Sequence, residues 1–234
     1  MFMSKRCSPY FIYKKLYDFF GPRGWWPVSG LYHPLRYKPG DEKEIFEICV
    51  GALLAQNTTW KNAERAVKNL MDEGLNSPSK LVKISEKRLA VLIRPSGYFN
   101  QKAKKLKAFA EFLILNAKDG IKRFFKGGVS ELREKLLSVK GIGPETADSM
   151  LLYAGNKDVF VVDAYTVRFA ARFGWLNTSV YGDVQSFFEG SLSRPFKVYN
   201  EYHALIVELA KQFCSKRSPV CNKCPVSQYC KKRV

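Results

Sequence analysis

The segment LLSVKGIGPETAD, residues 136–148, decides how the rest of the chain is interpreted. Its two glycines, Gly141 and Gly143, flank the single apolar residue Ile142. Glycine at both positions allows a tight turn and lets a phosphate approach the bare backbone, because no Cβ stands in the way. Pro144 suits the first turn of a following helix, whose amides would point toward an anion. The segment therefore predicts two helices joined by a hairpin that can hold a phosphate.

This pattern is a helix-hairpin-helix signature, which grips one DNA strand without reading its sequence. An ordinary corner between two helices is the alternative, because Gly-x-Gly alone is a weak signal. The charge favours DNA: 39 Lys and Arg against 21 Asp and Glu give a net charge of +18, which calls for an anionic partner. The residues assigned to the phosphate-binding hairpin are Gly141, Ile142, Gly143 and Thr146.

Composition argues against disorder and against a membrane span. Of the 234 residues, 46% are apolar and 14% aromatic, which is ample material for a buried core. The longest apolar run, residues 48–55, falls far short of the roughly 18 residues that cross a bilayer. The first ten residues hold no apolar stretch of signal-peptide length. We expect a protein of the reducing cytoplasm, associated with the nucleoid, in which disulfides are rare.

Apolar residues recur at helical spacing in several stretches, which predicts an all-α fold. The clearest stripes are Ile45, Ile48, Cys49, Ala52 and Leu53; Phe99, Ala103, Leu106, Ala110 and Leu113; and Tyr199, Tyr202, Ile206, Leu209 and Phe213. The one convincing β-like run, residues 159–162, is only four residues long. It stops at Asp163, which suits the N-cap of a helix that begins at Ala164.

Four of the six cysteines crowd into the last 21 positions. They are Cys214, Cys221, Cys224 and Cys230, in the spacing C-x6-C-x2-C-x5-C. Four thiolates at short spacing can converge on a zinc ion or on an iron–sulfur cluster. A zinc site usually pairs two C-x2-C knuckles, whereas this tail has a single close pair, so the spacing favours a [4Fe-4S] cluster, with zinc as the alternative. Cys7 and Cys49 are assigned no chemistry.

The hairpin, an Asp 20 residues after its second glycine (Asp163) and the cysteine tail together resemble the helix-hairpin-helix/Gly-Pro-Asp superfamily of DNA glycosylases, in its endonuclease III-like branch. Two more segments match in order, LLAQNT at residues 53–58 and GYFNQKA at residues 97–103. The resemblance spans about residues 41–230. It implies a base-excision-repair enzyme, acting as a monomer on double-stranded DNA that contains a damaged base.

The resemblance also implies a division of the chain into two lobes. A six-helix barrel that carries the hairpin would be built from residues 41–157. A second lobe, with the catalytic Asp and the cluster loop, would be built from residues 1–40 and 158–234. In such proteins the DNA lies across the cleft between the lobes.

One position separates the subtypes within this branch. In bifunctional members, the second residue after the hairpin's second glycine is a lysine, whose amine forms a Schiff base with the sugar and leads to strand cleavage. The corresponding residue is Glu145, and a carboxylate cannot form an imine. We therefore predict a monofunctional glycosylase, in which Glu145 simply complements the helix dipole as a first-turn acid.

The resemblance assigns catalysis to Asp163. Breaking an N-glycosidic bond builds oxocarbenium charge on the deoxyribose, and a fixed carboxylate stabilises that charge and orients or deprotonates the attacking water. An N-cap role is the alternative, and both roles can coexist. With only His33 and His203 in the chain, histidine-based metal hydrolysis and Ser-His-Asp chemistry have little support.

The aromatic residues resemble those with which type III 3-methyladenine DNA glycosylases sandwich the flipped base. The matching pocket residues are Trp25, Trp26, Pro27, Trp60 just after Gln-Asn-Thr, and Lys211, together with the RPSGY segment at residues 94–98. An N-alkylated purine carries positive charge, and each cation–π contact with an indole face contributes about 0.5–2 kcal/mol. A core plug for the tryptophans and a helix-end charge for Lys211 are the alternatives.

Gln56 and Tyr98 correspond to the family's wedges, which enter the duplex as the nucleotide rotates out. Plain surface positions are the alternative for both. The best-known enzyme of the alkylpurine type lacks the cysteine tail, so oxidised pyrimidines or mismatched bases remain alternative substrates. A non-catalytic helix-hairpin-helix DNA-binding protein is the alternative from another class.

Overall fold

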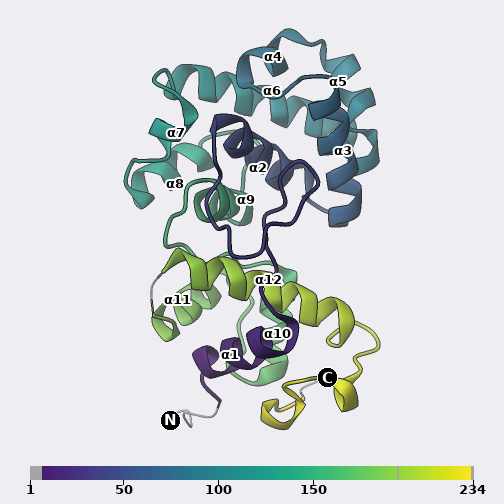
Figure 1. Cartoon of the computed structure of the whole chain (residues 1–234), viewed down its shortest axis with the longest axis vertical. Coiled ribbons are helices and arrows are strands. Elements are labelled where there is room, and N and C mark those ends of the chain that lie inside the picture. The colour runs from purple at the N-terminus through teal and green to yellow at the C-terminus, as the bar shows by residue number, and fades with distance from the viewer. Residues whose placement is uncertain (1–6, 194, 233–234) are drawn as a thin grey trace. The chain divides into compact units, whose positions relative to one another are not determined.

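The computed structural model describes residues 7–193 and 195–232, and its regular structure is helical (Figure 1). Within these residues no strand forms, and a single isolated bridge pairs Val28 with Leu31. The predicted all-α fold is therefore confirmed. None of the helices in the described part is long and apolar enough to cross a membrane. Residues 1–6, which belong to the stretch tested for a signal peptide, lie outside the described residues.

The chain forms two compact units, Trp26–Lys157 and Met1–Trp25 with Asp158–Val234. The sequence-based division placed residues 26–40 with the N-terminal segment, whereas the structure clusters them with residues 41–157. Packing gives the reason, because the Trp26 ring contacts the Trp60 ring at 4.9 Å between centroids. The backbone N–H of Ser29 also donates to the Glu47 carboxylate at 2.6 Å.

Helix α2 (Glu42–Leu54) is the core of the unit Trp26–Lys157. Every residue from Ile45 to Leu54 is buried, and α2 contacts α3, α6, α7 and α9 (Figure 1). A helix that is apolar on all sides needs neighbours all round, because each exposed face would leave apolar surface in water. The surrounding helices are α3 (Trp60–Asp72), α4 (Pro78–Lys83), α5 (Glu86–Leu92), α6 (Phe99–Asn116), α7 (Ile121–Phe124), α8 (Val129–Leu137) and α9 (Pro144–Ser149).

The hairpin forms between α8 and α9, and Pro144 opens α9 as predicted. Gly141 has φ +95°, and a Cβ there would lie 2.6 Å from the Lys105 Cγ atom, so this position requires glycine. Gly143 has an ordinary φ of −98° and open space where a Cβ would stand. Glycine therefore permits the turn at position 141 and leaves the backbone accessible at position 143.

A buried ion pair joins the two helices of the hairpin. Arg133 on α8 donates from Nε to Asp148 Oδ1 at 2.7 Å and from Nη2 to Asp148 Oδ2 at 3.2 Å. Asp148 on α9 is fully buried, whereas the Arg133 side chain is 32% exposed. Two parallel bonds from a planar guanidinium fix direction as well as distance, so this pair sets how α9 lies against α8.

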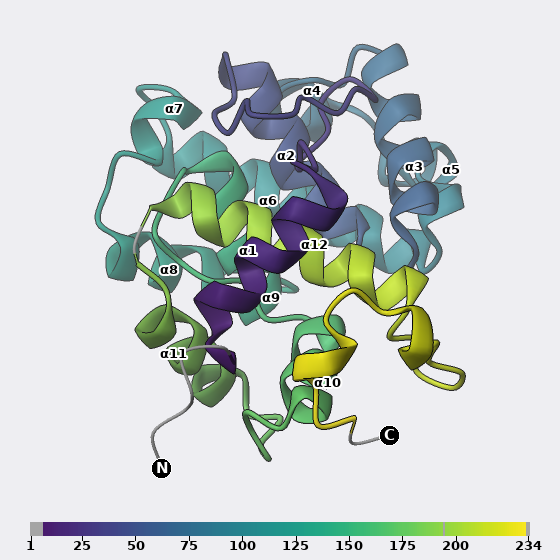
Figure 2. The ribbon, with the colours of Figure 1, turned by 60° about the horizontal axis from the view of Figure 1, so that its bottom comes forward.

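The other unit is built from α1 (Pro9–Phe20), α10 (Ala164–Phe173), α11 (Tyr181–Ser191) and α12 (Phe196–Gln212). Figure 2 shows α1 crossing α12, which also contacts α10. The predicted stripe from Tyr199 to Leu209 faces inward on α12, where its residues are buried. Beyond α12, the chain has two short 3-10 turns, Cys221–Lys223 and Ser227–Tyr229.

The β-like run 159–162 is buried but does not pair as a strand. Side chains of α11 take the place of a neighbouring strand: Phe160 N–H donates to Glu189 at 2.9 Å, and Gln185 donates to the Phe160 carbonyl at 2.7 Å. Buried backbone groups need partners, and here side chains supply them. The run ends at Asp163, where α10 begins at Ala164 as predicted.

We expect Arg133→Ala to lower the free energy of unfolding by about 3 kcal/mol, because it removes the guanidinium that pairs with the fully buried Asp148 carboxylate. Lys135→Ala is the matched control on α8, since it breaks the exposed Lys135–Glu131 pair and should change the free energy by less than about 1 kcal/mol. Urea unfolding of the full chain measures both. Equal transition midpoints for the two variants would contradict the role given to the Arg133–Asp148 pair.

Candidate active site

Asp163 occupies the N-cap of α10, at the end of the buried run. Its Oδ1 atom accepts from the Thr166 backbone N–H at 2.7 Å and from the Thr166 hydroxyl at 2.9 Å. Its Oδ2 atom lies 3.4 Å from Nε2 of His203, and the carboxylate side chain is 13% exposed. Oδ1 thus caps the helix, and Oδ2 faces the imidazole of His203.

Two opposing effects act on the pKa of Asp163. Burial is the largest and raises the pKa, because an ionised carboxylate loses its hydration. The nearby His203 imidazole, together with the two Thr166 contacts, more than offsets it, so the pKa lies below its ordinary value. The structure thus holds a buried carboxylate in its ionised form.

His203 is a site residue that sequence reasoning missed. It lies on α12, buried with 8% of its surface exposed, and belongs to the same unit as Asp163. The two residues are 40 positions apart, and His203 sits among the apolar and aromatic residues of its helix, where a core histidine is the ordinary interpretation. No local signal could have paired it with Asp163.

The unit Trp26–Lys157 contains a pocket of about 490 Å³. It is lined by Trp26, Pro27, Ser29, Gly30, Glu47, Trp60, Glu64, Arg65, Val67, Lys68, Met71 and Asp72. Three of the five predicted pocket residues, Trp26, Pro27 and Trp60, are brought together there. Its volume is in the range of small-molecule sites in proteins, which is about 300–1,000 Å³. Trp25 and Lys211 belong to the other unit and do not line this pocket.

The two indoles of the pocket pack against each other. Their ring planes meet at 82° with centroids 4.9 Å apart, an edge-to-face contact. Trp26 also contacts the Tyr153 ring at 5.3 Å. A base held between two parallel rings needs about 7 Å between them, twice the optimal carbon–carbon separation. In this structure a base can therefore stack on one indole face, but not between Trp26 and Trp60.

Glu47 is the buried charged side chain of this pocket, with 7% of its surface exposed. Burial raises its pKa, the Ser29 backbone N–H opposes the rise, and the charge of Glu44 adds to it. Sequence reasoning missed Glu47 because it lies within an apolar helix and in no recognisable motif. Cys49, to which the sequence analysis assigned no chemistry, is fully buried. This burial raises the pKa of its thiol.

The predicted wedges lie in different environments. Tyr98 caps α6 with φ +46°, an unusual conformation for a bulky residue, and its side chain is 67% exposed. Gln56 is half-buried and donates to the Gly141 carbonyl and to the Thr146 hydroxyl, at 3.0 and 2.9 Å. Lys105 also donates to Gln56 at 2.6 Å. Tyr98 is placed to project from the surface, whereas Gln56 ties the end of α2 to the hairpin.

Within the hairpin, the four predicted residues divide by exposure. Ile142 and Thr146 are buried, at 5% and 6% exposure, so they anchor the hairpin in its unit. Gly143 is exposed and Gly141 half-buried, which leaves the two glycines as the accessible backbone. Glu145 is exposed in the first turn of α9, as expected for an acid that complements a helix dipole.

The four tail cysteines line one small cavity of about 30 Å³, together with Arg172, Phe213, Ser227 and Lys232. Burial raises the pKa of Cys224 to about 11, and the other three thiols add to the rise, which shows that the four sulfurs are neighbours. Within the described residues, no three His, Cys, Asp or Glu side chains already have the arrangement that encloses a metal ion. The donor set fits a thiolate-bound centre by its chemistry.

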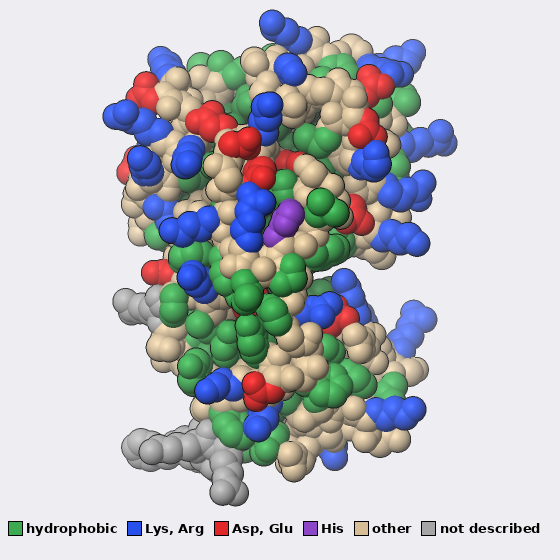
Figure 3. Space-filling view, in the orientation of Figure 1, with side chains coloured by type: hydrophobic (Ala, Val, Ile, Leu, Met, Phe, Trp, Pro, Cys, Tyr) green, Lys and Arg blue, Asp and Glu red, His purple; other side chains and the backbone are tan. Residues whose placement is uncertain are grey.

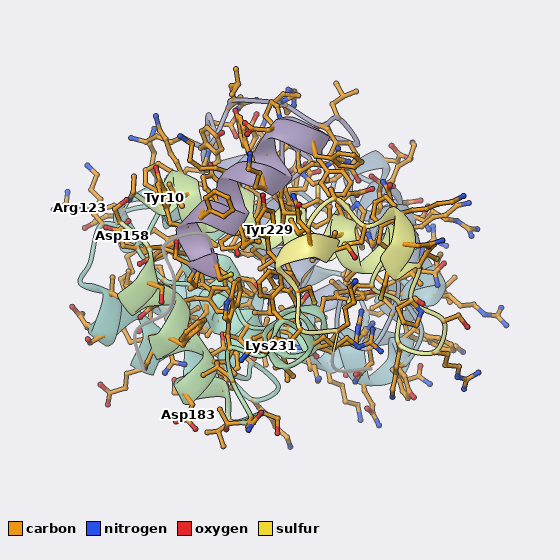
Figure 4. The ribbon with its side chains drawn as sticks, turned by 90° about the horizontal axis from the view of Figure 1, so that it is seen from below. Tyr10, Arg123, Asp158, Asp183, Tyr229 and Lys231 are labelled. Atoms are coloured by element: carbon orange, nitrogen blue, oxygen red, sulfur yellow. The ribbon has the colours of Figure 1, made fainter. Side chains whose placement is uncertain are left out.

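Two arginines of α10 shape this cysteine loop, and neither was predicted. Arg172 donates to the Ser215 carbonyl at 2.7 Å and to the Cys214 sulfur at 3.4 Å. Arg168 donates to the Cys214 carbonyl at 2.9 Å. The far side of the loop packs on α1, where the Tyr229 ring meets the Phe11 ring edge to face at 5.1 Å (Figure 4).

The surface charge is widely distributed. Figure 3 shows Lys and Arg side chains scattered over much of the face in view, with Asp and Glu among them. A diffuse positive potential of this kind attracts a polyanion and adds little to the selection of sequence.

Comparison with known proteins assigns the chain to a family. Residues 50–194 match the HhH-GPD superfamily of base excision DNA repair proteins. A protein of Methanocaldococcus jannaschii, whose name as a DNA repair glycosylase is provisional, is 42% identical over 94% of each chain. Endonuclease III of Sulfolobus acidocaldarius is 30% identical over 83% of this chain and 85% of its own.

A solved structure agrees with these relatives. The 3-methyladenine DNA glycosylase of H. pylori, bound to 1,N6-ethenoadenine, superimposes with a TM-score of 0.73 at 29% identity, over 88% of this chain and 98% of that one. The family match covers more than half of the sequence and includes both the hairpin and Asp163. The chain therefore belongs to the HhH-GPD superfamily of base excision DNA repair proteins.

Proposed function

We propose that this protein is a monofunctional DNA glycosylase that flips an alkylated purine, such as 3-methyladenine, out of DNA and hydrolyses its N-glycosidic bond. The observation that carries the substrate class is the pocket in which Trp26 and Trp60 meet. Electron-rich indole faces favour a cationic base over a neutral one. The likeness to a 3-methyladenine DNA glycosylase at 29% identity supports the same choice.

Asp163 supplies the charge that the reaction needs. As the glycosidic bond breaks, positive charge grows on the sugar, and a carboxylate that stays ionised stabilises it. Its lowered pKa makes Asp163 a weak proton acceptor, since an effective general base has a pKa near the working pH. We therefore assign it mainly an electrostatic role, through Oδ2, because Oδ1 holds the helix cap.

The leaving group removes the need for a strong acid. An N-alkylated purine departs as a neutral base, so no proton has to be delivered before the bond breaks. The hairpin contributes binding through the accessible backbone of Gly141 and Gly143, and the exposed Tyr98 fills the space that the flipped nucleotide leaves. Release of Gln56 from Gly141 and Thr146 would be needed before it could do the same.

The monofunctional assignment rests on which amines are accessible. Position 145 carries a carboxylate. Lys102 has a pKa lowered to about 8 by burial, which would suit a nucleophile. However, its ammonium is buried and donates to the carbonyls of Leu54 and Ser96, at 2.8 and 2.7 Å. Lys102 therefore acts as a structural cross-link within its unit.

We assign the cysteine loop a structural role, as the holder of a metal centre. Cys214, Cys221, Cys224 and Cys230 would hold a [4Fe-4S] cluster, with zinc as the alternative. The metal centre would stabilise four neighbouring, half-buried thiolates and so fix the shape of the loop. Three basic residues of this loop, Lys216, Arg217 and Lys223, are exposed and available to phosphates.

We expect the purified protein to release 3-methyladenine from methylated duplex DNA and to leave alkali-labile abasic sites. Borohydride should trap no covalent complex, because no accessible lysine replaces Glu145. Asp163→Asn should keep its affinity for an abasic-analogue duplex and lose about 100-fold or more in single-turnover excision. Asp158→Asn, at an exposed acid of the same unit, is the matched control (Figure 4).

The same assay includes duplexes with an oxidised pyrimidine and with G·T and G·U mismatches. Release from these substrates alone would reject the alkylpurine assignment and leave the glycosylase assignment intact. Borohydride trapping with any substrate would reject the monofunctional assignment. Full activity of Asp163→Asn would reject the mechanism.

A second prediction concerns His203, which we assign as a positioning residue. Without the imidazole, in His203→Gln, burial dominates and the pKa of Asp163 should rise. The acid limb of the excision rate should then move to higher pH. A lowered folded-state pKa stabilises the fold above the unfolded value of about 3.9, and this contribution is lost as the pH falls through the folded-state pKa. Acid unfolding should therefore also begin at higher pH in the variant.

Single-turnover excision and circular dichroism between about pH 3 and about pH 7, a range that extends to both sides of the ordinary Asp pKa of about 3.9, measure both shifts. His33→Gln is the control, because His33 lies in the other unit. A His203→Gln variant that loses activity equally at every pH would contradict the electrostatic role.

A third prediction concerns the metal centre. The purified protein should be yellow-brown and contain iron and sulfide, and Cys221→Ser should lose both. The salt dependence of duplex binding should become shallower by about 0.9 in log–log slope for each phosphate contact that the loop loses. Cys7→Ser is the control. A colourless protein with one zinc per chain would reject the cluster, and unchanged binding in Cys221→Ser would reject the DNA role of the loop.

A further inference from the structure

We infer that Glu47 sets the charge preference of the aromatic pocket, so that a positively charged base is accepted and a neutral base of similar size is disfavoured. The inference rests on the proposed glycosylase function and names the residue that selects the substrate within it. The chemical class is a purine with a fixed positive charge, as produced by N-alkylation.

The charge of the pocket differs from that of the whole chain. The net charge of the protein is +18, whereas acidic residues outnumber basic ones in the pocket lining. Lys68 and Asp72 pair with each other at 2.6 Å, and both are exposed, so their fields largely cancel. Of the remaining charged lining residues, Glu64 is half-buried, Arg65 is exposed and Glu47 is buried.

Burial makes Glu47 the influential charge. The interaction between two charges grows as the effective dielectric falls, and a buried group is screened least by water and salt. Glu47 lines the same cavity as Trp26 and Trp60. A cationic base stacked on either indole would meet both the π face and a carboxylate, whereas a neutral base would bury the carboxylate further without compensation. Both effects favour the cation.

A structural role for Glu47 is the competing explanation. Its Oε1 atom accepts from the backbone N–H of Ser29 at 2.6 Å. Ser29 has φ +53° and Gly30 φ +74°, which is the geometry of a tight type I′ turn closed by Val28 and Leu31. Glu47 thus anchors the turn that follows Trp26 and Pro27. The two roles are separable, because an amide oxygen can accept the same hydrogen bond without carrying charge.

The test is Glu47→Gln, which keeps the size and the acceptor for Ser29 and removes the charge. Single-turnover excision is compared for 3-methyladenine, a cation in the nucleotide, and for 1,N6-ethenoadenine, a neutral base. We expect the ratio of the two rates to fall at least tenfold relative to the wild type, and each factor of ten corresponds to about 1.4 kcal/mol. Glu111→Gln, at an exposed acid on α6, is the control for the change in net charge and should leave the ratio unaltered.

Equal losses on both substrates would overturn the inference and leave Glu47 as the anchor of the turn. A wild-type protein that releases neither base would instead reject the proposed function. If Glu47→Gln does not fold, a measurement on the wild type can still overturn the inference. Quenching of tryptophan fluorescence compares the binding of 3,9-dimethyladeninium, a permanent cation, with that of neutral 9-methyladenine. Equal affinities for these two probes would overturn the inference.

Discussion

The burial of α2 from Ile45 to Leu54 is the constraint on which the unit Trp26–Lys157 depends. Ten successive residues of this helix are buried, so the other helices of the unit must be arranged around it. Polar side chains on or next to such a buried helix need hydrogen-bond partners. In this unit those partners belong to the aromatic pocket and to the hairpin. Glu47 holds the turn behind the aromatic pocket, and Gln56, just beyond the helix, holds the hairpin. The pocket and the hairpin are thus attached to the same rigid helix.

Burial acts on two carboxylates in opposite ways. It is the largest effect on both Asp163 and Glu47, and it raises the pKa of each in isolation. At Asp163, an imidazole and two donors from Thr166 reverse the outcome, so the group stays ionised. At Glu47, a backbone amide gives only partial compensation. A carboxylate in the environment of Asp163 can stabilise positive charge that grows during a reaction. A carboxylate in the environment of Glu47 is stabilised when a ligand brings a positive charge.

The cysteine loop shows the same dependence on distant partners. The spacing of the four thiols brings them near one another, but the path of the loop is determined by Arg168 and Arg172 on α10 and by the contact of Tyr229 with α1. These arginines donate hydrogen bonds to backbone carbonyl groups that follow α12, the place where the carbonyls of a helix end need partners from outside the helix. The shape of the cysteine loop therefore depends on helix α10 as much as on the cysteines.

Local patterns in the sequence determined the helices, the hairpin with Pro144 at the start of α9, the cap at Asp163 and the grouping of the four tail cysteines. Each of these features depends on residues within a few turns of one another, where spacing alone decides what can meet. Only the tertiary structure placed His203 beside Asp163, Glu47 in the pocket with Trp26 and Trp60, and Gln56 on the hairpin. It also moved residues 26–40 to the unit of α2 and set the two indoles edge to face. These contacts join residues far apart in the chain, and packing of the whole core, which no local period encodes, decides them.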